Sequence, residues 1–494
     1  MWRARLYPMS KVGRVFAVLL RGRSLVAIGL LAAVGLLAYR HFANSGPAYQ
    51  VKDIVASGAS APQELTDVDG RLFFSADDDR HGRELWISDG TTVGTTMVKD
   101  IHPGAEGWAT MTPVGVAGTA FFVADDGDHG YELWKSDGSA NGTVIVKDIH
   151  PGLEGSGPGY LVETGGSLLF VADDGTHGDE LWTSDGTAAG TMMVEDIWQG
   201  TNRGSRPERR RRAFLARPLN LTDVAGRAFF SADDGNHGRE LWTSDGTAAG
   251  TVQVRDVRPG PLGSNPEALI DVVGTLFFTA NDGIHGRELW TSDGTTGGTT
   301  LVRDADRESA EGPQMLVDVA GTAFFTLRRG VEGDQLWRSD GTTSGTALVA
   351  VVNTGAADSS VRSLTDVGGT LFFTAVGEDA DAQLWRSDGT AAGTLLVTDL
   401  PGGPHAGPPE WLTEAAGILY FVARENDSGP WDAELWRSDG TAAGTFQVQD
   451  IQRGEHSSAP SWLTLVGETL FFATGNDDGE LWALPIGPES SLNV

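Results

Sequence analysis

Short apolar runs separated by polar turn residues recur along most of the chain, without the three-to-four-residue spacing of an amphipathic helix. Residues 219–257 contain "LNLTDVAG", "RAFFSADDG", "HGRELWTSDG" and "TAAGTVQVRDV" in succession. Each run is short, rich in β-branched or aromatic residues, and bounded by Gly, Asp or Asn. Runs such as "TLFFTA" and "TVIVKDI" are apolar at consecutive positions. The pattern therefore predicts units of four short strands, in sheets covered on both faces.

The four-strand unit is repeated, and a Leu-Trp pair marks each copy. The tryptophans are Trp86, Trp134, Trp182, Trp242, Trp290, Trp337, Trp385, Trp436 and Trp482. Successive copies are 48, 48, 60, 48, 47, 48, 51 and 46 residues apart. A period of forty to fifty residues is typical of repeat architectures, and four-stranded sheets stacked on both faces are typical of β-propeller blades. We expect an all-β protein with a single propeller of about nine four-stranded blades.

The two ends of the repeat array are complementary. The ninth copy stops after its third strand, and "YQVKDI" at Tyr49 to Ile54 is a fourth-strand sequence that precedes any first strand. Pairing this N-terminal segment with the last blade would close the ring and remove an exposed sheet edge.

The repeated phrase "ELWxSDGTxxGT" resembles that of the bacterial ELWxxDGT repeat proteins, exported proteins common in myxobacteria and similar organisms. The resemblance covers Tyr49 to Pro485 and implies a propeller, but little about biochemistry. Gln335 and Gln383 depart from the motif by replacing its Glu, and the last copy lacks the "SDGT" turn.

Within the motif, the tryptophan is suited to the core between blades, and the Asp-Gly pair is suited to a tight turn. We therefore interpret the repeated tryptophans as core residues and the repeated aspartates as turn formers. The aspartates are Asp89, Asp137, Asp185, Asp245, Asp293, Asp340, Asp388 and Asp439.

The charge distribution separates the N-terminal segment from the rest of the chain. The whole chain has 36 Lys and Arg against 67 Asp and Glu, and residues 1–47 hold seven of the basic residues and no acidic one. The remainder therefore carries 29 − 67 = −38, which disfavours binding to nucleic acid or anionic lipid. The absence of cysteine excludes disulfides and thiolate chemistry.

Residues 1–24 are basic, and residues 25–39 are an apolar run that fits a signal-peptide core or a signal anchor. Positive charge before that run predicts export of the propeller. It would be tethered on the periplasmic side by an uncleaved anchor, or secreted or on the cell surface if the signal is cleaved. We expect a linker at 40–48, the propeller at 49–486 and a C-terminal tail at 487–494.

Acidic loops follow the second strand of the first five repeats. Their acids are Asp77, Asp78, Asp125, Asp126, Asp173, Asp174, Asp233, Asp234 and Asp282. Oxygen ligands on a tight glycine turn could bind Ca²⁺, although a plain Asp turn is the simpler interpretation. A histidine follows in each loop, at His81, His129, His177, His237 and His285. One histidine per blade favours a hydrogen-bonded loop residue over a shared metal site.

A series of carboxylates occupies one position of the expected innermost strands. Its members are Asp67, Glu163, Asp223, Asp271, Asp318, Asp366 and Glu414. If they face the channel, they would form a ring that either concentrates cations or raises its own pKa values through like-charge repulsion. The plainer alternative is that each carboxylate caps its adjacent turn.

An arginine-rich insertion at 203–218 accounts for the 60-residue step. Its arginines are Arg203, Arg206, Arg209, Arg210, Arg211, Arg212 and Arg217. The insertion is either a solvated loop or a docking site for an acidic partner, such as an anionic polysaccharide.

No localised catalytic motif accompanies the repeats. The expectation is an exported, non-enzymatic and monomeric propeller that acts as an interaction or adhesion scaffold at the cell envelope, with a protein or polysaccharide partner. The alternative is a calcium-dependent carbohydrate-binding propeller, and a glycan-active enzyme is less favoured. Because the strands alternate in direction, the loops after the second strands, such as 77–82, and the blade-to-blade crossovers are expected on one face of the ring. Exposed aromatic residues on that face would favour the carbohydrate binder. The tryptophans outside the repeated motif are Trp108, Trp198, Trp411, Trp431 and Trp462.

Overall fold

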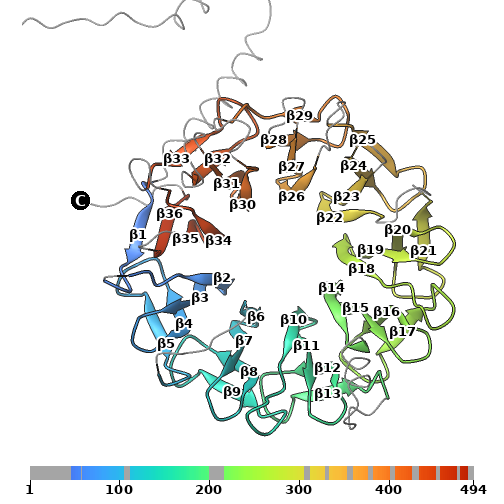
Figure 1. The fold of residues 1–494 in the computed structure, drawn as a ribbon, viewed down its shortest axis with the longest axis horizontal. Coiled ribbons are helices and arrows are strands. Elements are labelled where there is room, and N and C mark those ends of the chain that lie inside the picture. The colour runs from blue at the N-terminus through green and yellow to red at the C-terminus, as the bar shows by residue number, and fades with distance from the viewer. Residues whose placement is uncertain are drawn as a thin grey trace, which may run out of the picture. The chain divides into compact units, whose positions relative to one another are not determined.

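The computed structural model describes residues 46–487, apart from residue 57 and the segments 105–111, 200–215, 305–311, 329–332, 353–359, 377–381, 401–406, 425–432, 452–456 and 476–478. The expected targeting segment and the arginines from 203 to 212 lie outside the described residues. Residues Pro47–Ile486 form one compact unit, in which nine four-stranded antiparallel sheets are arranged as a ring (Figure 1). The prediction of nine propeller blades is confirmed. Within the described residues, no helix is long and apolar enough to cross a membrane.

Each blade has an inner, a second, a third and an outer strand, and blades one to nine follow chain order. The inner strands are β2 (Gln63–Val68), β6 (Val114–Val116), β10 (Gly159–Thr164), β14 (Leu219–Val224), β18 (Glu267–Val272), β22 (Gln314–Val319), β26 (Arg362–Val367), β30 (Glu410–Ala415) and β34 (Ser461–Val466). The second strands are β3 (Arg71–Asp77), β7 (Thr119–Asp125), β11 (Ser167–Asp173), β15 (Arg227–Asp233), β19 (Thr275–Asn281), β23 (Thr322–Arg328), β27 (Thr370–Val376), β31 (Ile418–Arg424) and β35 (Thr469–Ala473).

The third strands carry the Leu-Trp pair. They are β4 (Arg83–Ser88), β8 (Tyr131–Ser136), β12 (Asp179–Ser184), β16 (Arg239–Ser244), β20 (Arg287–Ser292), β24 (Asp334–Ser339), β28 (Ala382–Ser387), β32 (Ala433–Ser438) and β36 (Leu481–Pro485). The outer strands are β5 (Thr96–Lys99), β9 (Val144–Lys147), β13 (Met192–Glu195), β17 (Val252–Arg255), β21 (Thr300–Arg303), β25 (Ala347–Ala350), β29 (Leu395–Leu396), β33 (Phe446–Gln449) and, in the ninth blade, β1 (Tyr49–Lys52).

The N-terminal strand closes the ring, as the sequence predicted. β1 pairs antiparallel with β36, with Tyr49 opposite Ala483 and Gln50 opposite Trp482. Val51 of this strand is only 1% exposed. The backbone N–H groups of Ile54 and Val55 donate hydrogen bonds to the carboxylate of Glu480. Residues more than 400 positions apart in the sequence therefore complete one blade.

The hydrophobic core is divided into nine clusters, each between two neighbouring blades. In one of them, Phe73 and Leu85 of blade one pack with Phe122 and Trp134 of blade two. The motif tryptophan of the following blade is a buried member of six clusters. In the other three clusters it is partly buried and packs against the core. Burial of each large apolar side chain contributes about 1.5–3 kcal/mol. Six motif tryptophans thus belong to the core between blades, and three lie at its edge.

The glutamate of the "ELW" motif holds the crossover between blades, a role that sequence reasoning missed. Glu84, buried in blade one, accepts hydrogen bonds from the backbone N–H groups of Ile101 and His102. Glu132, Glu180, Glu240, Glu434 and Glu480 do the same for their own crossovers. A Ser hydroxyl also donates to Glu132, Glu240, Glu434 and Glu480. Each carboxylate satisfies backbone donors that would otherwise be buried without partners.

The aspartate of "SDGT" is a turn former. In blade one, Asp89 accepts hydrogen bonds from the backbone N–H and the hydroxyl of Thr91, and Ser88 and Thr95 share a hydrogen bond between their hydroxyls. The glycine of the closing "GT" lies directly against this carboxylate, so that a Cβ at Gly94 would overlap Asp89. This contact explains why the motif continues to its final Gly-Thr pair.

Alternation of strand direction gives the ring two faces. We call the crossover face the one that carries the loops after the second strands, such as 77–82, together with the blade-to-blade crossovers. The turn face carries the inner hairpin turns, such as 69–70, and the "SDGT" turns. Crossovers and loops meet in the structure, since Asp173 donates its backbone N–H to Ser156 of the preceding crossover.

Candidate functional site at the inner rim

Eight inner strands contain a bulge at their second residue, near the crossover face. In β2, for example, the register with β3 shifts between Gln63 and Thr66. The bulge residue has a positive φ of 52–59° in every case although none is glycine. We call these residues the inner rim: Glu64, Tyr160, Asn220, Ala268, Met315, Ser363, Trp411 and Trp462. This conformation costs a non-glycine residue about 1–3 kcal/mol, so the surrounding fold must compensate for it.

Part of the compensation is a threonine two residues after the bulge. The hydroxyl of Thr66 donates to the carbonyl of Glu64, and Thr222, Thr365, Thr413 and Thr464 make the same hydrogen bond in their own strands. The corresponding sequence signal is a Leu-Thr pair that follows the bulge residue. The sequence reasoning did not use this signal.

Two tryptophans of the inner rim come together on neighbouring blades. Trp411 of β30 and Trp462 of β34 have ring centroids 5.4 Å apart and an interplanar angle of 46°. Trp411 is 41% exposed, whereas Trp462 packs partly against the core between blades nine and one. Sequence reasoning singled out both residues, but only the structure pairs them. Trp198 lies elsewhere, near Gly235, and Trp108 and Trp431 lie outside the described residues.

Tyr160 belongs to the same rim and contacts the end of the insertion. The guanidinium of Arg217 lies 5.7 Å from the centre of the Tyr160 ring. The carbonyl of Arg217 accepts a hydrogen bond from Arg239, a residue whose pKa burial lowers to about 10. Arg217 is therefore held by blades three and four, and the docking role predicted for the other arginines stays a prediction.

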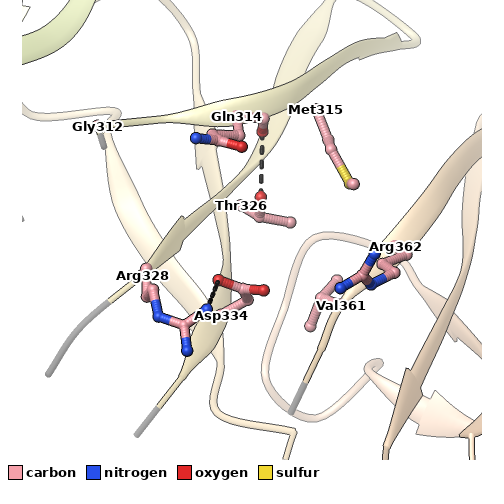
Figure 2. Close-up of a pocket in the computed structure, with 8 residues that line it drawn as sticks. All are labelled: Gly312, Gln314, Met315, Thr326, Arg328, Asp334, Val361 and Arg362. Atoms are coloured by element: carbon pink, nitrogen blue, oxygen red, sulfur yellow. Dashed lines mark hydrogen bonds and ion pairs between the residues drawn. The ribbon is translucent and has the colours of Figure 1, made fainter. Parts of the chain in front are cut away.

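A cavity of about 190 Å³ lies beside Met315, between blades six and seven (Figure 2). Figure 2 shows Arg328 and Asp334 paired on one wall, and Val361 and Arg362 of the next blade on another. The guanidinium nitrogen and the carboxylate oxygen of the pair are 3.8 Å apart. In blade four the two charges are exchanged between the strands: Asp233 ends the second strand and pairs in register with Arg239 of the third. The guanidinium of Arg239 donates hydrogen bonds to Ser231. In blade six the shorter Asp334 stands at the arginine position.

The carboxylates of the expected channel ring lie at the other end of the inner strands and cap their turns. Asp67 accepts a hydrogen bond from the backbone N–H of Gly70 at 2.9 Å. The equivalent hydrogen bond is present at Glu163, Asp223, Asp271, Asp318, Asp366 and Glu414. This geometry is that of the turn-cap alternative, and the cation-concentrating role stays a hypothesis.

Each acidic loop is held together by its own aspartate and histidine. Asp78 accepts the backbone N–H groups of Arg80 and His81, and its second oxygen lies 2.8 Å from Nδ1 of His81. His129, His177, His237 and His285 pair in the same way with Asp126, Asp174, Asp234 and Asp282. The hydrogen bond to Asp78 raises the pKa of His81. Burial would raise the pKa of Asp78, but its hydrogen bonds from His81 and Arg80 lower it.

No group of three or more Asp, Glu, His or Cys side chains among the described residues is arranged to hold a metal ion. Calcium binding by the acidic loops therefore remains a prediction based on the sequence.

No protein-family model matches the chain, and no curated protein matches it in sequence. Solved structures of several enzymes show a distant likeness to the chain. A puromycin hydrolase has 16% identity and a TM-score of 0.39 over 77% of this chain and 62% of its own. A prolyl endopeptidase has 11% identity and a TM-score of 0.42, and the match covers 93% of this chain and 58% of the endopeptidase. Prolyl oligopeptidase B from Galerina marginata has 12% identity and a TM-score of 0.40, and the match covers 82% of this chain and 60% of the oligopeptidase.

The chain thus spans about 60% of the length of these solved chains. Because the similar structures are enzymes, they contradict the prediction of a non-enzymatic interaction or adhesion scaffold. That prediction and its carbohydrate-binding alternative are corrected, because the structures to which the chain is similar are those of enzymes. At these identities and TM-scores the likeness also assigns no peptidase activity to this chain.

Proposed function

We propose that the inner rim binds a basic polypeptide segment, with the Trp411–Trp462 pair as its main contact. The observation that carries the proposal is the pair itself. Two large aromatic side chains from adjacent blades have ring centroids 5.4 Å apart, and both stand at bulge positions with a positive φ. Strained backbone that the surrounding fold maintains is concentrated at functional sites. Aromatic surfaces bind both apolar side chains and the cationic groups of Lys and Arg.

Charge supports a basic rather than an acidic polypeptide. Residues 48–494 carry a net charge of −38, and Glu410 is exposed next to Trp411. The acidic loops lie on the same face as the inner rim. A negative field of this kind attracts cationic segments and repels acidic ones, more strongly at low salt. The basic and then apolar N-terminal sequence supports placing this binding outside the cytoplasm.

The test is a calorimetric titration of the chain with a short peptide of Lys, Pro and Phe, compared with a peptide in which Glu replaces each Lys. We expect binding of the basic peptide alone. The double substitution Trp411→Ala and Trp462→Ala should weaken it at least about tenfold, because aromatic and cation–π contacts each contribute about 0.5–2 kcal/mol. Phe446→Ala is the matched control, since Phe446 is an exposed aromatic residue on outer strand β33. Equal binding by the double variant, or preference for the acidic peptide, would rule out the proposal.

A further inference from the structure

A cationic side chain spans the junction between blades at five places in the ring. It comes from the last residue of an outer strand, and its charged group lies 5.5–5.9 Å from the centre of the next blade's motif tryptophan. The same group donates to the carbonyl of the threonine that ends the "SDGTxxGT" turn, at 2.5–2.8 Å. The residues are Lys52, Lys99, Lys147, Arg255 and Arg303. We call this arrangement the cation clamp.

The junction between blades three and four has the opposite charge at this position. Glu195 stands at the end of β13, where the preceding outer strands β5 and β9 end in Lys99 and Lys147. The three junctions after blades six, seven and eight have the neutral residues Ala350, Thr398 and Gln449 there. Glu195 is therefore the one acidic residue among the nine positions. Its backbone pairs with β12, but its side chain makes no hydrogen bond or ion pair with the described residues.

A cavity of about 450 Å³ is present where the clamp is missing. Its walls include Glu195, Asp234, Trp242, Thr251 and Gln253. Trp242 and Thr251 are the tryptophan and the carbonyl-bearing residue that a clamp from blade three would contact. Trp242 is only partly buried, whereas Trp134 and Trp182, which lie under clamps, are 5% and 6% exposed.

Two further features give the cavity polar and negative character. Gln253 replaces the apolar Met97, Ile145, Met193 and Leu301 of other outer strands, and its side-chain nitrogen is buried without a hydrogen-bond partner among the described residues. Asp196 and Asp234 add two acidic side chains to the wall. A cavity of this size is within the range of small-ligand sites, about 300–1,000 Å³.

We propose that this cavity binds an external alkylammonium or alkylguanidinium group, such as a lysine or arginine side chain, in the place that the cation clamp fills at other junctions. The cation would lie over Trp242, donate to the carbonyl of Thr251 and pair with Glu195. The chain provides its own precedent, because five of its basic side chains make the first two of these contacts. The site is separate from the inner rim, since it lies along outer strands β13 and β17.

The experiment is a calorimetric titration of the full chain with N-acetyl-lysine methylamide and N-acetyl-arginine methylamide, alongside the norleucine analogue, which has an alkyl chain without charge. The expected result is binding of one or both cationic compounds and none of norleucine. A lysine-containing peptide and the free diamine cadaverine form two further arms. Tighter binding of the peptide identifies a protein side chain as the source of the cation, and tighter binding of cadaverine identifies a free amine.

Glu195→Lys is the decisive variant, because it recreates the clamp found at neighbouring junctions. This substitution should abolish ligand binding and raise the melting temperature, while Glu195→Gln should weaken binding about tenfold or more. Lys147→Met, at the preceding junction, is the matched control and should leave the titration unchanged. Trp411→Ala with Trp462→Ala should also leave the titrations with the N-acetyl-lysine and N-acetyl-arginine compounds unchanged, so failure here is distinguishable from failure of the inner-rim proposal.

Three results would overturn the proposal: no binding of any cation to the full chain at millimolar concentration, equal binding of norleucine, or unaltered binding to Glu195→Lys. A fourth result would also overturn it: the cationic compounds bind only to a variant in which Arg209, Arg210, Arg211 and Arg212 are replaced by Ser, and not to the unmodified chain. In that case the chain's own insertion would compete for the cavity.

Discussion

At the residue scale, the buried glutamates of the "ELW" motif hold the crossovers between blades, and burial also makes these glutamates harder to ionise. Burial raises the pKa of Glu84 to about 7 and that of Glu180 to about 8, despite hydrogen bonds from two backbone N–H groups to each. The chain also contains the neutral alternative. Gln383 occupies the same position in blade seven and accepts the backbone N–H of Leu400 at 2.9 Å. A neutral acceptor is therefore sufficient to hold a crossover.

Glu180→Gln should reduce the pH dependence of stability. The folded-state pKa is above the ordinary value of 4.5, so protonation favours the folded state. The stability from this group is fully present below about pH 4.5 and is lost as the pH rises through about 8. The Gln variant should avoid a loss on the order of 3 kcal/mol between pH 5 and pH 8. Chemical denaturation at a series of pH values measures this slope.

The reverse substitution, Gln383→Glu, is the control and should steepen the fall in stability over the same range. If the slope of stability against pH were the same in Glu180→Gln as in the unmodified chain, ionisation of the crossover glutamate at neutral pH would not reduce the free energy of unfolding.

At the element scale, the "SDGTxxGT" turn depends on an aspartate that lies across its last glycine. Blade five offers two adjacent glycines that differ in this contact. A Cβ at Gly298 would overlap the carboxylate of Asp293, whereas a Cβ at Gly297 would meet nothing within 4 Å. Neither glycine has a positive φ, so the difference between them is one of space and not of backbone conformation.

Gly298→Ala should destabilise the protein by about 1–3 kcal/mol, because Asp293 must give up its hydrogen bonds to Thr295. Gly297→Ala should be neutral or stabilise it by up to about 1 kcal/mol, since alanine reduces the entropy of the unfolded chain. Thermal unfolding followed by circular dichroism compares the two variants. Equal melting temperatures would show that the aspartate contact does not require glycine.

At the scale of the whole molecule, one short strand joins the two ends of the array. β1 contributes backbone pairing with β36 and the buried side chain of Val51. It also supplies the clamp from Lys52 to Thr95 and accepts, at the Val51 carbonyl, the hydroxyl of Thr92. It therefore completes blade nine and attaches that blade to blade one.

A chain that starts at Val55 should melt at a lower temperature and aggregate. It loses the burial of Val51, about 1.5–3 kcal/mol, and exposes the edge of β36 to pairing with other chains. A chain that starts at Gly46 keeps β1 and is the control. Light scattering and calorimetry measure the difference, and equal stability and solubility of the two chains would refute closure by β1.

The sequence by itself determined the nine blades, their four strands, the turn aspartates and the closing strand. These features depend on apolar patterns and turn residues that act over a few positions, and repetition makes each pattern visible several times. The same local information indicated Trp411 and Trp462 as residues of interest and assigned loops such as 77–82 to one face. It did not reveal the bulges at the inner rim or the anchoring role of Glu84.

Only the tertiary structure decided which side chains share a site. Trp411 and Trp462 are 51 positions apart and meet because the ring brings successive inner strands together. The cavity beside Glu195 arises because the outer strand of blade three faces Trp242 of blade four. Both sites lie between blades, where contacts join residues of different repeats. A repeat pattern specifies each blade, but the differences between neighbouring blades become a site only when the ring sets them side by side.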